Sequence, residues 1–300
     1  MPYLCGLWRF ANAYSVFNRK DSLVKMLREY RKILSRKEFT ISFMLLFFSV
    51  IGEFIYGCKM FRNVSLSGVI SAYDGTILSN NFNSPFGICY GVLLPVIVSL
   101  MGSTSAYEEK KQNILSSIYT RTNRAKYIWE QGGAVFLASF LGVLFCLGIS
   151  FLLASIMLPI QGYNTMFMTD YAKLVSVDSE YMLDELYRLH PYLNLCVFIF
   201  MRSMFAGAFA FMAYGISFFG RWVNKIIIVL SPILWLICYQ MAFAILKRIF
   251  EGKNLHLWFS SDILSMNHYG KFQVLIVLWL ILVLIGILGM VKEMRRGDVL

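Results

Sequence analysis

The sequence predicts an all-α integral membrane protein with six transmembrane helices and an amphipathic helix at the membrane surface before them. Hydrophobic residues make up 58% of the 300 residues and charged residues only 15%. A soluble chain has about 45–50% apolar and about 25% charged residues. The apolar residues are also clustered in runs close to the ~20 residues that a helix needs to cross the hydrocarbon layer. A soluble enzyme, a coiled coil and a disordered adaptor are therefore excluded.

Six predicted spans follow one another along the chain. They comprise residues 39–56, 86–106, 134–158, 197–219, 226–246 and 273–291. Only two charged residues, Glu53 and Arg202, lie inside them. We therefore expect an N-terminal cytoplasmic segment, 1–38, followed by a single transmembrane domain, 39–300.

Basic residues are concentrated on one side of this topology. With the N-terminus inside, 19 of the 28 Lys and Arg residues fall in cytoplasmic segments and 8 in the outer loops. Lys and Arg are retained on the cytoplasmic side when a membrane protein inserts, so both termini are expected in the cytoplasm. The net charge of +11 is then explained by membrane orientation, and no nucleic-acid partner is expected. The chain has no visible cleavable signal peptide, and the first span is expected to direct insertion.

The segment before the first span, residues 21–37, has the pattern of a two-faced helix. Apolar residues recur at a spacing of three and four: Leu23, Met26, Leu27, Tyr30, Ile33 and Leu34. Basic residues fill the positions between them, which is typical of a helix lying in the headgroup region of a bilayer. Two interpretations stay open: a surface anchor for the first span, or an element that passes force into it.

The cytoplasmic loop 107–133 holds a second, shorter amphipathic helix. Its apolar stripe consists of Ile114, Leu115, Ile118 and Tyr119. Two acidic residues, Glu108 and Glu109, precede it, residues 120–123 break it, and basic residues lead back into the membrane. Because so small a loop has no core of its own, the stripe must contact the membrane surface or a groove in a partner.

This loop and the six-span plan resemble the permease subunits of type-2 ABC exporters. The matching positions are Glu108, Glu109, Ile114, Leu115, Arg121 and Arg124. The sequence departs from the family pattern at Gln112 and Asn113, where glycine is usual, at Thr120, where proline is common, and at Glu130, where lysine is frequent. The resemblance implies that Glu108, Glu109, Ile114, Leu115, Ile118, Tyr119, Arg121 and Arg124 couple the chain to a separate ATPase subunit.

The resemblance also implies the partners. A second copy or a paralogue of the chain would pair with it in a bacterial plasma membrane, and ATP and Mg²⁺ would be bound by the partner ATPase. The chain itself lacks the glycine-rich loop followed by Lys and Ser or Thr that cradles phosphates. We expect no cofactor in this chain, and outward movement of a small hydrophobic or amphipathic cargo, with a peptide as one candidate.

Two features inside the spans carry further hypotheses. Glu53 and Arg202 are predicted at the same depth near the outer surface, where they either form an ion pair or reach the surface separately. Small residues recur every four positions along one face of the second span: Gly87, Gly91, Pro95, Ser99 and Ser103. That face either packs within the bundle or lines a route between two subunits.

Catalysis by the chain itself is not expected. All three histidines, His190, His256 and His268, fall in predicted outer loops, and no metal-ligand motif is visible. A membrane-embedded enzyme or processing factor that uses the outer loops, and a scaffold that transports nothing, remain alternatives. The six cysteines form no CxxC pair, and a bridge between Cys58 and Cys196 stays open.

Overall fold

The computed structural model describes residues 19–62, 69–79, 84–160, 183, 186, 189–220, 223–249 and 272–295. They form helices α2 (Arg19–Leu34), α3 (Lys37–Phe61), α4 (Pro85–Leu100), α5 (Ser105–Lys111), α6 (Ile114–Arg121), α7 (Arg124–Met157), α10 (Pro191–Ile216), α11 (Lys225–Ile249) and α12 (Phe272–Arg295). This part of the chain contains no strand. The predicted all-α class is confirmed. The two chain ends, predicted to be cytoplasmic, lie outside the described residues.

Six helical segments of the described chain are long and apolar enough to cross a membrane, as predicted. They are α3, α4 together with α5, α7, α10, Lys225–Leu246 within α11, and α12. Each of these helices begins before its predicted apolar run. α7 begins at Arg124, well before the predicted residue 134, since the Asn123 side chain accepts a hydrogen bond from the Ala125 backbone N–H at 3.0 Å.

The second predicted span is not one continuous helix. α4 ends at Leu100, residues 101–104 form turns, and α5 starts at Ser105. The sequence explains the break, because hydroxyl side chains compete with the helical hydrogen bonds there: Ser99 Oγ donates to the Val96 carbonyl at 2.8 Å, and Ser103 Oγ donates to the Ser99 carbonyl. The break turns α5 away from α4 at one end of the bundle.

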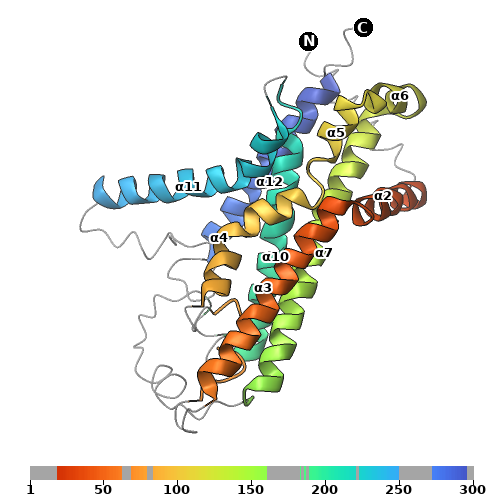
Figure 1. Ribbon diagram of the computed structural model, residues 1–300. Coiled ribbons are helices and arrows are strands. Elements are labelled where there is room, and N and C mark those ends of the chain that lie inside the picture. Colours follow the sequence, from red (N-terminus) through yellow and green to blue (C-terminus); the bar gives the residue numbers. More distant parts are fainter. Residues whose placement is uncertain are drawn as a thin grey trace.

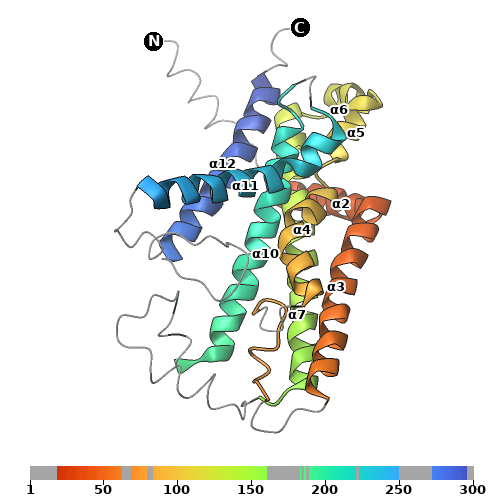
Figure 2. The same cartoon turned by 60° about the vertical axis from the view of Figure 1, so that its left-hand side comes forward.

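The long helices share a common direction with one exception. α3, α7 and α10 lie lengthwise beside one another, and α12 runs along α10 toward the end of the bundle that carries α5 and α6 (Figure 1). α11 lies across this direction in both views (Figure 2), although the sequence predicts a transmembrane span there. Among its described side chains, the buried ones, including Ile228 and Ser231, lie in the first half, and Tyr239 in the second half is only partly buried against the core.

α2 also lies across the bundle and packs on α7 (Figure 1). It ends at Leu34, where the sequence predicts continuation to residue 37, and a short turn leads to α3. Its apolar side is divided. Ile33 is buried in a core that it shares with α7, α10 and α12, whereas Leu27 is 55% exposed. α2 is thus tied to the bundle and still presents apolar surface outward.

The chain between α3 and α4 partly enters the bundle. Residues 71–79 are buried in successive turns. The backbone N–H of Ala72 donates to the Pro159 carbonyl at 2.9 Å, and that of Ile77 donates to Ser150 Oγ at 3.1 Å. This segment closes the end of the bundle opposite α5 and α6.

Candidate functional site: the end of the bundle that carries α5 and α6

The short helix predicted in the loop is α6, and it follows α5 almost without a linker. Asn113 joins the two helices with a φ of 56°, in the left-handed region. Among residues with a side chain, asparagine is one of the few that adopt this region readily. The position at which the resemblance expects glycine therefore requires a glycine-like backbone, which Asn113 provides.

The apolar stripe of α6 is split between the protein and its surroundings. Leu115 is buried, and Tyr119 packs against the core formed by α2, α7, α10 and α12. Ile114 points outward with 43% of its surface exposed, and Ile118 is half-buried. The side chain of Arg121 lies outside the described residues. Of the predicted stripe, Ile114 thus offers the largest apolar surface to a partner.

Glu109 lies at the centre of the polar contacts behind α6. It is only 4% exposed, and its Oε1 lies 2.7 Å from Lys32 Nζ and 3.6 Å from Arg36 Nη2. Its Oε2 accepts hydrogen bonds from Tyr127 Oη at 2.8 Å and from Gln131 Nε2 at 3.1 Å. One buried carboxylate therefore connects α5 to α2, to the turn before α3 and to α7.

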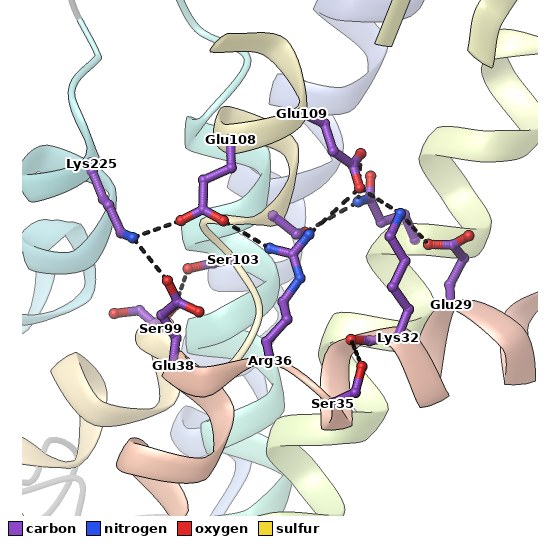
Figure 3. A network of polar contacts seen from close by, with 12 residues as sticks. Glu29, Lys32, Ser35, Arg36, Glu38, Ser99, Ser103, Glu108, Glu109 and Lys225 are labelled. Atoms are coloured by element: carbon purple, nitrogen blue, oxygen red, sulfur yellow. Dashed lines mark hydrogen bonds and ion pairs between the residues drawn. The ribbon is translucent and has the colours of Figure 1, made fainter. Parts of the chain in front are cut away.

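Glu108 extends these contacts to α11. Its Oε1 lies 2.6 Å from Lys225 Nζ, and its Oε2 lies 3.2 Å from Arg36 Nη1. Lys225 also contacts Glu38 at 3.2 Å, at the start of α3. Figure 3 shows these side chains converging from α3, from the turn before it, from α5 and from α11. We call Lys32, Arg36, Glu38, Glu108, Glu109 and Lys225 the α5 charge cluster.

A separate ion pair connects α6 and α7 to α12. Arg124 Nη2 lies 2.6 Å from Glu293 Oε1, and the Arg124 guanidinium lies 4.7 Å from the centre of the Tyr119 ring. Burial, followed by the charge of Glu293, raises the pKa of Tyr119 to about 12. Its hydroxyl is therefore uncharged at physiological pH. Among the described residues, three buried atoms around the pair have no hydrogen-bond partner: Arg124 Nε, Glu293 Oε2 and Tyr119 Oη.

The sequence identifies only part of this site. It singles out Glu108, Glu109, Tyr119 and Arg124, but it misses their partners: Lys32, Arg36, Glu38, Tyr127, Gln131, Lys225 and Glu293. Each of these polar residues lies near an end of a long helix, and that position is the only signal in the sequence. It does not reveal which residues meet.

Glu53 and Arg202 do not contact each other. Glu53 is 2% exposed, and its Oε2 accepts a hydrogen bond from Ser84 Oγ, which also accepts one from the Gly87 backbone N–H at 2.9 Å. Ser84 is the N-cap of α4, so its position beside α3 brings it to the carboxylate. Arg202 is buried separately on α10. The structure thus places Glu53 with Ser84, and the ion pair considered from the sequence is not formed.

The small-residue face of α4 packs within the bundle at both ends. Gly87 is buried at the Ser84 end, and Ser99 Oγ donates to the Val229 carbonyl of α11 at 2.8 Å. Pro95 is buried between these ends, whereas Gly91 is half-buried with no atom within 4 Å of its Cβ position. Ser103 lies beyond the end of α4, in the turn, so it does not extend the face as predicted.

Two further features concern the chemistry of the described residues. Cys58 and Cys196 are free and exposed, so the bridge left open by the sequence is not formed. Within the described ranges, no three His, Cys, Asp or Glu side chains are grouped so that they could hold a metal ion. In comparisons with family models, curated proteins and solved structures, no match to the chain is found.

Proposed function

We propose that this chain is the transmembrane subunit of an ATP-driven exporter of the type-2 ABC class, with α6 as the contact for a separate ATPase subunit. The observation that carries the proposal is the placement of α6. A short amphipathic helix with an exposed Ile114 lies between the second and third membrane-span-capable segments, next to ion pairs that join α5 to α2 and α11 and join α7 to α12.

These contacts supply a route for mechanical coupling. A displacement of α6 would act on α12 through Arg124 and Glu293, and on α5 through the turn at Asn113. From α5, Glu109 reaches α2 and Glu108 reaches α11. Rigid helices joined by charged contacts transmit displacement when they have two arrangements to move between. ATP binding and hydrolysis in the partner would bias that equilibrium.

Export requires a second subunit in this proposal. Within the described part of the chain, α11 is poorly covered, and apolar side chains such as Ile226 and Leu234 are exposed. A second copy or a paralogue packed on α11 would cover this surface and enclose a route for cargo. The proposed cargo is a small hydrophobic or amphipathic molecule, with a peptide as one candidate, and the proposed location is a bacterial plasma membrane with α6 facing the cytoplasm.

The ATPase contact is tested by a matched pair of variants. Ile114→Asp places a charge on the exposed face of α6, at its first residue, where an acidic side chain favours the helix. Ile160→Asp makes the same change at a residue that is 68% exposed after the far end of α7. The chain is purified with its partners from cell membranes, and ATP hydrolysis is measured as phosphate release.

We expect ATP hydrolysis to accompany the wild-type chain and Ile160→Asp, and to be lost with Ile114→Asp. Undiminished hydrolysis with Ile114→Asp, or none with the wild-type chain, would contradict the proposal. Hydrolysis of another substrate by the purified chain alone would instead support a membrane-embedded enzyme. A scaffold would show neither activity.

The proposed orientation has its own test. Single cysteines replace Lys111 on α5 and Arg62 at the far end of α3, in a chain whose native cysteines are changed to serine. A membrane-impermeant maleimide added to intact cells should label position 62 only. Labelling of position 111 without permeabilisation would overturn the proposal.

A further inference from the structure

An open apolar groove runs between α3 and α7, closed at one end by α2. It has a volume of 790 Å³, and its lining includes Phe39, Phe43, Gly142, Phe145, Gly148 and Leu152. Tyr30 and Leu34 of α2 complete it at the α2 end, and every lining residue other than Tyr30 is apolar. None of these side chains belongs to the α5 charge cluster or to the exposed face of α6.

The groove is open because α7 lacks a side chain at one position. A Cβ added to Gly148 would meet no atom within 4 Å. The opposite wall carries the stacked rings of Phe39 and Phe43 on α3, whose centres lie 6.1 Å apart. Phe43 also meets Phe145 of α7 at 6.1 Å between ring centres, and beyond this contact the described residues leave the space beside Gly148 open.

The length of the groove matches one leaflet of a bilayer. Its lining on α7 runs from Leu141 to Leu152, which corresponds to about 16 Å of helix at the usual rise per residue. Half of a ~30 Å hydrocarbon layer is about 15 Å. An acyl chain that enters at α2 would therefore extend along the whole groove and end near the middle of the membrane.

The α2 end of the groove carries basic residues that form no ion pair within the described part of the chain. Arg31 lies between the lining residues Tyr30 and Leu34, and Lys37 begins α3 just before Phe39. Both basic side chains are exposed. Neither forms an ion pair with any other described residue, in contrast to the neighbouring Lys32 and Arg36.

We propose that this groove binds an anionic phospholipid, with one acyl chain between α3 and α7 and the phosphate group at Arg31 and Lys37. The apolar lining and its length fit the acyl chain, and the two exposed cations fit the phosphate. This inference goes beyond the proposed export function and does not depend on it. A lipid here would fix the angle between α2 and α3 by filling the space that they enclose.

Filling the groove tests the acyl-chain site. Gly148→Leu projects into open space, and Gly91→Leu makes the same change on α4, where a Cβ also meets no atom within 4 Å. The binding of dioleoylphosphatidylglycerol and dioleoylphosphatidylcholine to the purified chain in detergent is measured by native mass spectrometry. Displacing two or more methylenes corresponds to about a tenfold loss of affinity. We expect that loss for Gly148→Leu and wild-type binding for Gly91→Leu.

Removing the cations tests the headgroup site. Arg31→Gln with Lys37→Gln should abolish the preference for phosphatidylglycerol over phosphatidylcholine while leaving binding of the latter unchanged. Lys59→Gln with Arg62→Gln, at the opposite end of α3, should keep the preference. Equal loss in both double variants would show non-specific attraction and overturn the headgroup site.

A cross-linking measurement keeps the proposal testable if Gly148→Leu does not fold. Phosphatidylglycerol with a photoactivatable acyl chain is bound to the wild-type chain, and the labelled peptides are identified by mass spectrometry. Adducts concentrated within residues 141–152 support the proposal. Adducts spread evenly over exposed apolar residues, such as Leu230 and Leu234 of α11, would overturn it. If Gly148→Leu instead dissociates a dimer of the chain and leaves lipid binding unchanged, the groove is covered by a second copy and the lipid proposal is overturned.

Discussion

Gly289 of α12 lies directly against the carbonyl group of Gly215 in α10. A Cβ added to Gly289 would come within 2.0 Å of the Gly215 carbonyl oxygen, and one added to Gly215 would come within 2.3 Å of the Gly286 carbonyl oxygen. Such distances are far below van der Waals contact, and backbone atoms cannot rotate away. The two helices therefore pack backbone to backbone, as small residues allow in membrane proteins.

We expect Gly289→Ala to destabilise the protein by about 1–3 kcal/mol, the usual cost of overpacking. Since alanine favours a helix by about 1 kcal/mol over glycine, the same change at an open position should stabilise it. Gly91→Ala is that comparison, because no atom lies within 4 Å of its Cβ position. Thermal unfolding in detergent, followed by tryptophan fluorescence, checks both. A Gly289→Ala variant as stable as Gly91→Ala would contradict the close backbone contact between α10 and α12.

The two adjacent acids of the α5 charge cluster should differ in their contribution to stability. Glu109 is buried and accepts two side-chain hydrogen bonds besides its ion pairs, whereas the Glu108 side chain is 28% exposed. Glu109→Gln should therefore cost about 2 kcal/mol of unfolding free energy, the scale of hydrogen bonds to a buried charge. Glu108→Gln should cost about 0.5 kcal/mol, as expected of exposed ion pairs.

Thermal unfolding at low and high salt measures this difference. Added salt should reduce the effect of Glu108→Gln more than that of Glu109→Gln, because solvent screens the exposed pair more strongly. Equal losses of unfolding free energy at both positions would contradict the prediction that the buried carboxylate contributes more to stability.

Hydropathy alone predicts the number of long helices and most of their positions. It works because a run such as residues 273–291 must avoid water in any fold. The break between α6 and α7 is also predictable, since Asn123 both interrupts the apolar stripe and caps the next helix. These features depend on residues close together in the sequence.

Features that depend on contacts between distant segments are not predictable in this way. Arg31 and Lys32 look equivalent in the amphipathic pattern, but only Lys32 meets Glu109, because α5 brings this carboxylate to one side of α2. Gly148 and Gly289 are likewise similar members of apolar runs, although one faces open space and the other a carbonyl group. The direction of α11 depends on its few contacts with α4 and α10, which its uniform apolarity does not encode.

The Arg124–Glu293 ion pair should be restored by exchanging its charges. Arg124→Glu alone places two carboxylates together, and Glu293→Arg alone places two cations together, at a site where Glu293 is buried and Arg124 half-buried. Each should cost about 2 kcal/mol, between the values for exposed and for buried ion pairs. The double variant should recover most of that loss, less the lost contact of the guanidinium with the Tyr119 ring.

A double-mutant cycle of thermal stabilities checks this prediction. Lys126 and Glu130, whose charged atoms lie 3.9 Å apart within α7, are a useful comparison. Pairs four residues apart on a helix contribute only about 0.2–0.5 kcal/mol. A double variant of Arg124 and Glu293 no more stable than its worse single variant would show that the two charges are not paired.

Charge exchange at Glu53 and Arg202 should give the opposite result. Glu53 contacts the Ser84 hydroxyl, and Arg202 lies on another helix, so Glu53→Arg with Arg202→Glu creates two misplaced charges. We expect the double variant to be no more stable than Glu53→Arg alone. Ser84→Ala should cost about 1–2 kcal/mol, because it removes both the cap of α4 and the donor to a buried carboxylate. Ser155→Ala is the control. It removes only a hydroxyl that donates to the Phe151 carbonyl of its own helix, so it should lower the unfolding free energy little. Thermal stabilities of these four variants decide between the two arrangements, since recovery of stability in the double exchange would require an ion pair between positions 53 and 202.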